Sequence, residues 1–541
     1  MKRPAWMWHR DAERMKQGRK FLMKKIGIDK DSTNPQSRTA QYRFRFLSAW
    51  GAAFLSCAVT GCTVGPKYHP PVTQAPTVYK ESPAQPHQDA GPWTVAQPQD
   101  AMLRGNWWEV FHEPELNALE DRLNIDNQTI KQYFQNFMEA RALVGEARAL
   151  YFPTATGTPS FSRSLSSGNL TNSTTANVGK LFTLYQLPAT VSWEPDVWGR
   201  VRNTVHAAEY NAQVSAADLE NERLSEQVAL AEYYFEIHGQ DALVRLYAET
   251  VEADRKTLAL TQALYETGVD DQVSVVEAQS TLQSAESAAT NLGILRAQYE
   301  HAIAVLVGKQ ASNFSIPVRP LTVAPPPVPI GIPSQLLERR PDIAAAERTM
   351  AAANAEIGVA YAAFYPNLVL SASGGTQSSA FSHLLDWPSR FWSVGPTISV
   401  PLFNAALDPT LHEYVAIYNA DLANYRQTVL TAFQQVEDYL AQVRILSQQI
   451  QQQRQAVSSA QDALNLEIGR YETGVDPYID VVALQTTLLG DRQTLADLQV
   501  EQMMGAVELV GSLGGGWDTS QLPTPAQVAK GPAKADTKIQ R

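Results

Sequence analysis

The sequence predicts a mainly α-helical chain with membrane β-strands, built from two copies of one plan. Three observations support this fold class. Two stretches share a pattern in register, LYETGVDDQVSVVEAQSTL at 264–282 and RYETGVDPYIDVVALQTTL at 470–488, so the chain is an internal duplication. Proline-free helical runs of about 70 residues would each extend roughly 100 Å. Each half also holds two segments rich in Thr, Ser and aromatic residues, which are typical of membrane strands.

Each repeated stretch predicts the tip of a helical hairpin. A long helical run ends at Gly268 in the first copy and at Gly474 in the second, and glycine tolerates the left-handed conformation of a helix C-cap. An Asp follows where a helix N-cap belongs, and Pro477 then occupies the favoured first helical position. Ordinary turns between antiparallel helices would give the same local pattern. The length of the helical runs that flank each glycine argues against ordinary turns.

Residues 1–61 form a predicted signal region. Residues 1–45 carry 13 Lys and Arg against 4 Asp and Glu, and residues 46–61 carry no charge. That uncharged run is shorter than the ~20 residues of a membrane-spanning helix and suits a secretory signal. It ends at Cys62, where VTGC resembles a bacterial lipobox. Cys57 is the weaker candidate for acylation, and Cys62 as a buried cysteine after a plain signal is the alternative. The long segment before the signal also suggests translation from Met23.

Composition excludes several classes of function. The chain outside residues 1–45 carries a formal charge of −20, which argues against nucleic acid as a partner. Its two cysteines provide no disulfide framework and no cysteine metal cluster. The nine histidines include no His-x-x-x-His pair, and the glycines at 514–516 precede no helix that could hold a phosphate. We therefore expect no enzyme, no metal site and no cofactor apart from a covalent lipid on Cys62.

In chain order, residues 62–105 are expected to be an extended, acylated tether, because they are rich in proline and lack periodicity. A first repeat spans 106–330 and a second spans 331–517. The expected helices cover 114–150, 197–267, 270–307, 334–363, 410–473 and 477–513. The expected strands cover 151–163, 181–194, 366–376 and 390–403. The tail at 518–541 is expected to be disordered. Trp387, Phe391 and Trp392 suit a membrane interface, with a sandwich core as the alternative.

The helix lengths and the strand number together predict association of several chains. Two long helices and two end-to-end pairs of shorter ones all reach about 100 Å, which is too long for a compact globule. Four strands cannot close a barrel, since outer membrane barrels begin at about 8 strands. Unpaired edges are forbidden in lipid, so copies must combine their sheets. Three copies would supply 12 strands and two copies 8, and the residues do not choose between them.

Five motifs, one of them present twice, make the chain resemble the TolC-like outer membrane factors of tripartite efflux systems, in the NodT or RND outer membrane lipoprotein branch. The motifs are CTVGPKY at 62–68, NWWEVF at 106–111, PSQLLERRPDI at 333–343, the two tips, and LGGGW at 513–517. The resemblance implies a homotrimer with a 12-stranded β-barrel in the outer membrane and a 12-helix tunnel in the periplasm. It also implies an exit duct that passively conducts drugs or other small molecules, and so contributes to antibiotic resistance.

The resemblance further implies partners and site residues. The partners would be a periplasmic membrane fusion adaptor, an inner membrane pump of the RND type, and outer membrane lipid, into which a palmitate on Cys62 would insert. The tips would dock against the adaptor through Thr267, Gly268 and Val269 and through Thr473, Gly474 and Val475. Tyr471 would help to close the periplasmic entrance, and Asp480 would belong to a ring that selects cations. The family's second ring position is Ala483 here, which leaves the strength of that selection open.

Two other classes of protein were weighed against the channel. A periplasmic lipoprotein adaptor or coiled-coil spacer also uses long helical hairpins, but it would lack two duplicated strand pairs between its helices. A periplasmic lipoprotein enzyme would need a cluster of polar catalytic side chains, which the sequence does not offer. The strand segments therefore discriminate between a channel and an adaptor.

Overall fold

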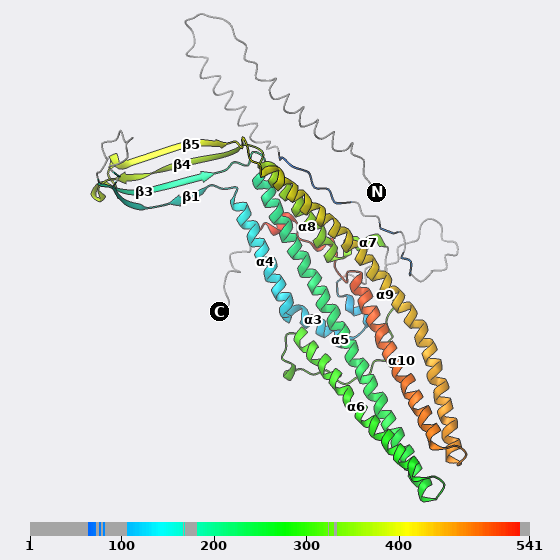
Figure 1. The fold of residues 1–541 in the computed structure, drawn as a ribbon. Coiled ribbons are helices and arrows are strands. Elements are labelled where there is room, and N and C mark those ends of the chain that lie inside the picture. The colour runs from blue at the N-terminus through cyan, green and yellow to red at the C-terminus, as the bar shows by residue number, and fades with distance from the viewer. Residues whose placement is uncertain are drawn as a thin grey trace, which may run out of the picture. The chain divides into compact units, whose positions relative to one another are not determined.

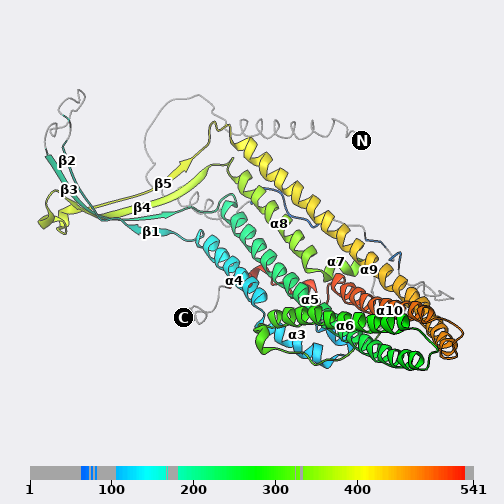
Figure 2. The same ribbon diagram turned by 60° about the horizontal axis from the view of Figure 1, so that its bottom comes forward.

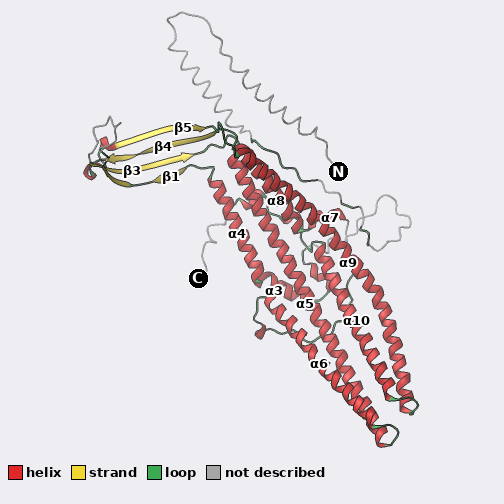
Figure 3. Ribbon diagram, viewed as in Figure 1, coloured by secondary structure: helices red, strands yellow, loops and turns green. Residues whose placement is uncertain are grey.

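The computed structural model describes residues 63–71, 75–76, 79–81, 105–165, 167, 181–322, 324–328 and 333–530. Residues 62–541 form one compact unit, to which all of these belong. Helices dominate this unit and a single sheet of five strands adjoins them (Figure 1). In Figure 3, which colours helices red and strands yellow, the hairpin tips lie at the end of the helices away from the sheet.

Two very long helices form the frame of the helical part. They are α5 (Arg200–Glu266) and α9 (Leu407–Glu472), and the predicted helices 197–267 and 410–473 are confirmed. The return helices are α6 (Gln272–Leu306) and α10 (Tyr478–Ser512). Figure 2 shows each return helix running beside its long partner from the tip. Among the described residues, no helix is both long enough and apolar enough to cross a membrane.

Two predicted single helices are wrong, because each is broken into two. The segment 114–150 forms α3 (Pro114–Asp126) and α4 (Gln128–Ala149), since Asn127 leaves helical geometry with ψ 129° and its side chain accepts a hydrogen bond from the Ile130 N–H at 2.9 Å. The segment 334–363 forms α7 (Pro333–Arg339) and α8 (Pro341–Ala362). Arg340 is extended because Pro341 disfavours helical geometry in the residue before it.

The five strands form one antiparallel sheet. They are β1 (Thr154–Gly157), β2 (Ser160–Leu165), β3 (Leu181–Trp193), β4 (Asn367–Ser378) and β5 (Arg390–Ser399). β1 and β2 both pair with β3, then β3 with β4 and β4 with β5. The first predicted strand, 151–163, begins only at Thr154, is interrupted at 158–159, where Pro159 cannot donate a ladder hydrogen bond, and continues to Leu165. The predicted strands 181–194 and 366–376 are confirmed, and the strand predicted at 390–403 ends at Ser399.

The sheet has one apolar face and one polar face. In register, Val191 of β3 pairs with Ala372 of β4, which pairs with Val394 of β5. On the opposite face, Thr190 pairs with Ser373, and the Ser373 and Ser393 hydroxyls lie 2.9 Å apart. This alternation follows the period of two that side chains have along a strand. β5 forms one end of the sheet, and β1 and β2 form the other.

The aromatic residues predicted for a membrane interface lie on the surface of the described chain. Trp392 is 80% exposed and Trp387 is 76% exposed. The Arg390 guanidinium lies 3.8 Å from the centre of the Trp387 ring. A sandwich core around these two tryptophans is therefore wrong for this chain.

The main hydrophobic core lies where the shorter helices meet end to end. It includes Trp107 of the 3-10 turn at 107–111 and residues of α3, α5, α9 and α10. The glycines at 514–516 fit tightly here: a Cβ on Gly516 would lie 2.0 Å from the Gly105 carbonyl oxygen, and one on Gly514 would lie 2.2 Å from the Arg339 carbonyl oxygen. The LGGGW motif is thus a packing motif, because only glycine lets these backbones approach.

The described chain termini are held against the helices. Gly65 packs on Gly358 of α8, where a Cβ would lie 2.8 Å from the Gly358 Cα. The Asn354 side chain donates a hydrogen bond to the Pro66 carbonyl oxygen at 3.2 Å. At the other terminus, residues 519–521 and 525–528 are helical, and Val528 is buried against α4 and α5. The predicted disorder of 518–541 is therefore wrong for 518–530, while 531–541 lie outside the described residues.

Candidate functional site

The two hairpin tips have the same backbone geometry. Gly268 has φ +74° and Gly474 has φ +71°, the left-handed conformation that favours glycine. In the first tip the Val269 N–H donates to the Leu264 carbonyl oxygen at 3.0 Å, and in the second the Val475 N–H donates to the Arg470 carbonyl oxygen at 3.0 Å. These bonds satisfy carbonyl groups that a helix end would otherwise leave free.

The tips present small exposed groups and lie beside each other. Val269 is 58% exposed and Val475 is 65% exposed. Thr267 and Thr473 turn back, and each hydroxyl donates to carbonyl oxygens of its own helix. A Cβ on Gly474 would lie 3.5 Å from the Val269 Cγ1, so the first tip contacts the second.

Tyr471 connects the two tips. Its side chain is 3% exposed, and its hydroxyl donates a hydrogen bond to the Asp270 carboxylate at 2.5 Å and lies 3.2 Å from the Thr261 hydroxyl. Its ring packs against Tyr478 with centroids 5.4 Å apart. Burial, followed by the hydrogen bond to Asp270, raises the pKa of Tyr471 to about 12, so the phenol is the donor at neutral pH.

Asp270 is a partner that sequence reasoning missed. Burial acts to raise its pKa, but hydrogen bonds from Tyr471, the Asp271 N–H and Ser274 outweigh burial, and its pKa is lowered. At the equivalent position of the first tip, Tyr265 is 46% exposed. The equivalent aspartate of the second tip, Asp476, instead pairs with Arg470 of its own tip, with Nε and Oδ2 2.5 Å apart.

Asp480 lies exposed in the first turn of α10. It shares this end of the second hairpin with other acids. Burial, Asp476 and Asp480 all act to raise the pKa of Glu467. The second tip therefore concentrates negative charge, while Ala483, one helical turn after Asp480, adds none.

A buried polar layer joins α5 to α10 above the tips. The Gln485 amide donates to the Thr257 hydroxyl at 3.2 Å. Asp254 is 5% exposed, and burial raises its pKa to about 6. Its charge also acts to raise the pKa of Tyr478. The contact between α5 and α10 thus holds an acid that is expected to ionise near neutral pH.

The two candidate residues for lipid attachment cannot be placed. Cys62, the predicted lipid attachment residue, and the alternative Cys57 lie outside the described residues. Within the described part of the chain, no group of three or more His, Cys, Asp or Glu side chains could hold a metal ion.

Comparison with known proteins identifies the family. The family described as "Outer membrane efflux protein" matches residues 120–309 and 332–515. The chain belongs to this family. The probable efflux pump outer membrane protein TtgC of Pseudomonas putida is 31% identical over 493 residues, covering 88% of this chain and 98% of TtgC. Outer membrane protein OprJ of Pseudomonas aeruginosa is 30% identical, covering 87% of this chain and 96% of OprJ.

Solved structures agree with the family. The outer-membrane channel OprN has a TM-score of 0.76 and 26% identity, covering 84% of this chain and all of OprN. The outer membrane protein VceC from Vibrio cholerae has a TM-score of 0.70 and 27% identity, covering 76% of this chain and 99% of VceC.

These similarities confirm the predicted fold class and function. The chain has the TolC-like fold, and it is an outer membrane efflux channel protein that extends into the periplasm. The periplasmic adaptor alternative is not supported. The proteins to which the chain is similar are channels and efflux components rather than enzymes.

Proposed function

We propose that three copies of this chain form one continuous exit duct that conducts drugs or other small molecules passively. The observation that carries this proposal is the sheet with one apolar face, one polar face and two ends. Lipid cannot satisfy the backbone groups of an unpaired strand, so β5 of one copy would pair with β1 and β2 of the next. Three sheets would then enclose a polar lumen and present Val191, Ala372 and Val394 to lipid.

The helices would continue the duct into the periplasm. α5 and α9 hold 67 and 66 residues, which corresponds to about 100 Å each. Three copies would place twelve helical columns around one tunnel. A water-filled tunnel needs few contacts with its solutes, so catalysis is neither required nor proposed. Energy would come from an inner membrane pump, which the family resemblance predicts to be of the RND type.

The tips would close the tunnel and dock with a periplasmic adaptor. The hydrogen bond from Tyr471 to Asp270 fastens the second hairpin to the first, so it would hold the entrance closed in the resting duct. The exposed Val269 and Val475, beside their glycines, would be the apolar contacts for the adaptor. Asp480 would attract cations to the entrance. A lipid on Cys62 would anchor each copy to the outer membrane.

Native mass spectrometry of the full protein released from detergent tests the stoichiometry. The proposal predicts a homotrimer, and a stable dimer or monomer would contradict it. Planar-bilayer conductance tests the duct itself, so stoichiometry and conduction are judged separately.

A further inference from the structure

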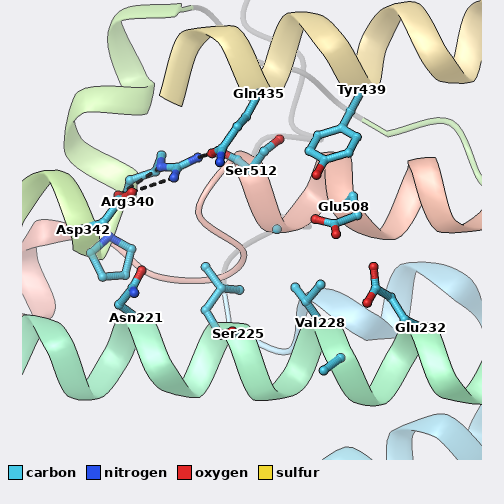
Figure 4. A pocket seen from close by; sticks show the side chains of 14 residues that line it. Asn221, Ser225, Val228, Glu232, Arg340, Asp342, Gln435, Tyr439, Glu508 and Ser512 are labelled. Atoms are coloured by element: carbon cyan, nitrogen blue, oxygen red, sulfur yellow. Dashed lines mark hydrogen bonds and ion pairs between the residues drawn. The ribbon is translucent and has the colours of Figure 1, made fainter. Parts of the chain in front are cut away.

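A polar cavity lies in the helical wall far from the tips. Its volume is about 370 Å³, and it is lined by side chains of α5, α8, α9 and α10 together with Arg340 (Figure 4). α8 begins at one side of it and α10 ends there at Ser512. The cavity therefore marks the junction at which the shorter helices meet between the two long ones.

At one end of the cavity, Arg340 links neighbouring helices through hydrogen bonds. Its guanidinium donates to both carboxylate oxygens of Asp342, at 3.0 and 2.6 Å. It also donates to the Gln435 side chain at 2.8 Å and to the Ser512 carbonyl oxygen at 2.9 Å. Because Asp342 pairs with Arg340 directly, this cation is already neutralised.

The other end holds two acids that face each other. Figure 4 shows Glu232 of α5 and Glu508 of α10 directed toward one another, with the Tyr439 hydroxyl of α9 directed at Glu508. All three side chains line the same cavity. Two carboxylates have only acceptors, so a bond between them requires one proton on the pair. Side chains of three helices thus meet around one pair of acids.

Burial and the neighbouring acids favour protonation of this pair of acids. Burial, Glu508 and then Glu236 all act on Glu232 in the same direction, and they raise its pKa to about 8. Burial and Glu508 raise the pKa of Tyr439 to about 12, with Glu232 and Asp438 adding to the effect. The charged groups at the other end are Arg340 and Asp342, which neutralise each other. Among the described groups that shift the pKa of Glu232, none carries a positive charge.

We propose that Glu232 and Glu508 share one proton, and that this proton is a switch that fastens α10 to α5 at this junction. Loss of the proton would leave two like charges facing each other beside a cavity large enough for water, so water would enter the junction and the helices would separate. This switch acts in the channel wall and is independent of the roles proposed for the tips.

The sign of the pH dependence follows from the raised pKa. A carboxyl group whose pKa is higher in the packed state favours that state in acid. At a pH below the ordinary value of 4.5 the packed and loosened states are both protonated. As the pH rises from there to about 8, the packed junction loses stability relative to the loosened one. The junction is thus expected to be tightest in mild acid and loosest above pH 8.

Infrared titration of the full protein from about pH 5 to about pH 9 tests the shared proton directly. The C=O stretch of a protonated carboxyl should be present at neutral pH and should disappear with a midpoint near 8. Glu232→Gln and Glu508→Gln should each remove this component. Glu249→Gln, on an exposed part of α5 and paired only with Arg245 on the surface, should keep it. Spectra of the first two variants that match wild type would overturn the proposal.

A fourth variant guards against loss of folding. Tyr439→Phe keeps both acids but removes a hydroxyl that is directed at the pair and would donate a hydrogen bond to it once it is ionised, so the midpoint of the infrared component should rise. In the same preparations, the thermal unfolding midpoint of wild type should fall between about pH 5 and about pH 8. That fall should shrink in Glu232→Gln and not in Glu249→Gln. A lower or unchanged infrared midpoint in Tyr439→Phe also contradicts the shared proton.

Discussion

The Tyr471 hydroxyl donates a hydrogen bond to the Asp270 carboxylate at 2.5 Å, across 201 residues of sequence. This bond joins the end of α9 to the turn between α5 and α6. The phenol is shielded from solvent and its acceptor is a carboxylate, so the bond belongs to the stronger, charge-assisted class. In the proposed duct, opening of the tips would require this hydrogen bond to break.

Tyr471→Phe removes this bond while keeping the buried ring. Hydrogen bonds to charged groups contribute roughly 1.5 to 3 kcal/mol, so the open population should rise by about one to two orders of magnitude. Cells that carry the variant should become sensitive to large hydrophilic antibiotics that the outer membrane normally excludes. Tyr265→Phe, at the equivalent and exposed position of the first tip, is the matched control and should change nothing. Equal sensitivity of both variants would show that the hydrogen bond from Tyr471 to Asp270 does not hold the entrance closed.

Gly474→Trp tests adaptor docking. The left-handed backbone costs roughly 1 to 2 kcal/mol with a side chain, and the indole would cover the Val269 and Val475 surface. Efflux should be abolished while trimer yield is unchanged, as measured by drug resistance and by native mass. Gly490→Trp, where an added Cβ would meet nothing within 4 Å in mid-α10, serves as the control for a bulky residue on that hairpin. Retained resistance in Gly474→Trp would remove the docking role.

Asp480→Ala should weaken cation selectivity. A ring of three carboxylates at a narrow entrance raises the local cation concentration, and alanine abolishes it. The reversal potential in a salt gradient should shift toward zero, by more in low salt than in high salt because of screening. Glu472→Ala, a nearby exposed acid at the end of α9, should shift it less. An unchanged reversal potential in Asp480→Ala would show that the residue is only a solvated acid.

Asp254→Asn tests the buried acid between α5 and α10. Burial raises its pKa from the ordinary 3.8 to about 6, so the packed tips lose stability as the pH rises through that window. The asparagine variant should therefore show a smaller fall in the thermal unfolding midpoint between about pH 4 and about pH 6. Asp462→Asn, on the exposed surface of α9, should behave as wild type. A steeper fall in the Asp254 variant would reverse the sign and contradict this account.

Cys62→Ser should abolish the covalent lipid. Metabolic labelling with palmitate and intact mass measurement would detect the loss. Cys57→Ser should retain the label, which distinguishes the two candidate cysteines. Label that persists in Cys62→Ser and vanishes in Cys57→Ser would move the attachment site.

Much of the fold followed from the sequence because it rests on local rules. Short windows of sequence are enough to predict the glycine turns at 268 and 474, the long proline-free helices and the period of two in β3. The breaks at Asn127 and Arg340 were missed because each depends on one residue within a strongly helical run. The order of 518–530 was missed because it depends on burial of Val528 against distant helices.

The site was predicted less completely for the same reason. Tyr471 and the tip residues were found through the repeat and the family resemblance. Their partners were not, since Asp270 and Thr261 meet Tyr471 only after α5 and α9 are packed side by side. The pair of Glu232 and Glu508 is likewise invisible in the sequence, where two ordinary glutamates stand on separate helices.

Planar-bilayer conductance of the purified protein, wild type beside Tyr471→Ala/Asp480→Ala, tests the central claim most directly. The account predicts a small wild-type conductance that rises sharply in the double variant, because the hydrogen bond to Asp270 is lost and the entrance is wider. A channel that is equally open in both proteins would contradict closure at the second tip. No channel in either protein would contradict the duct itself.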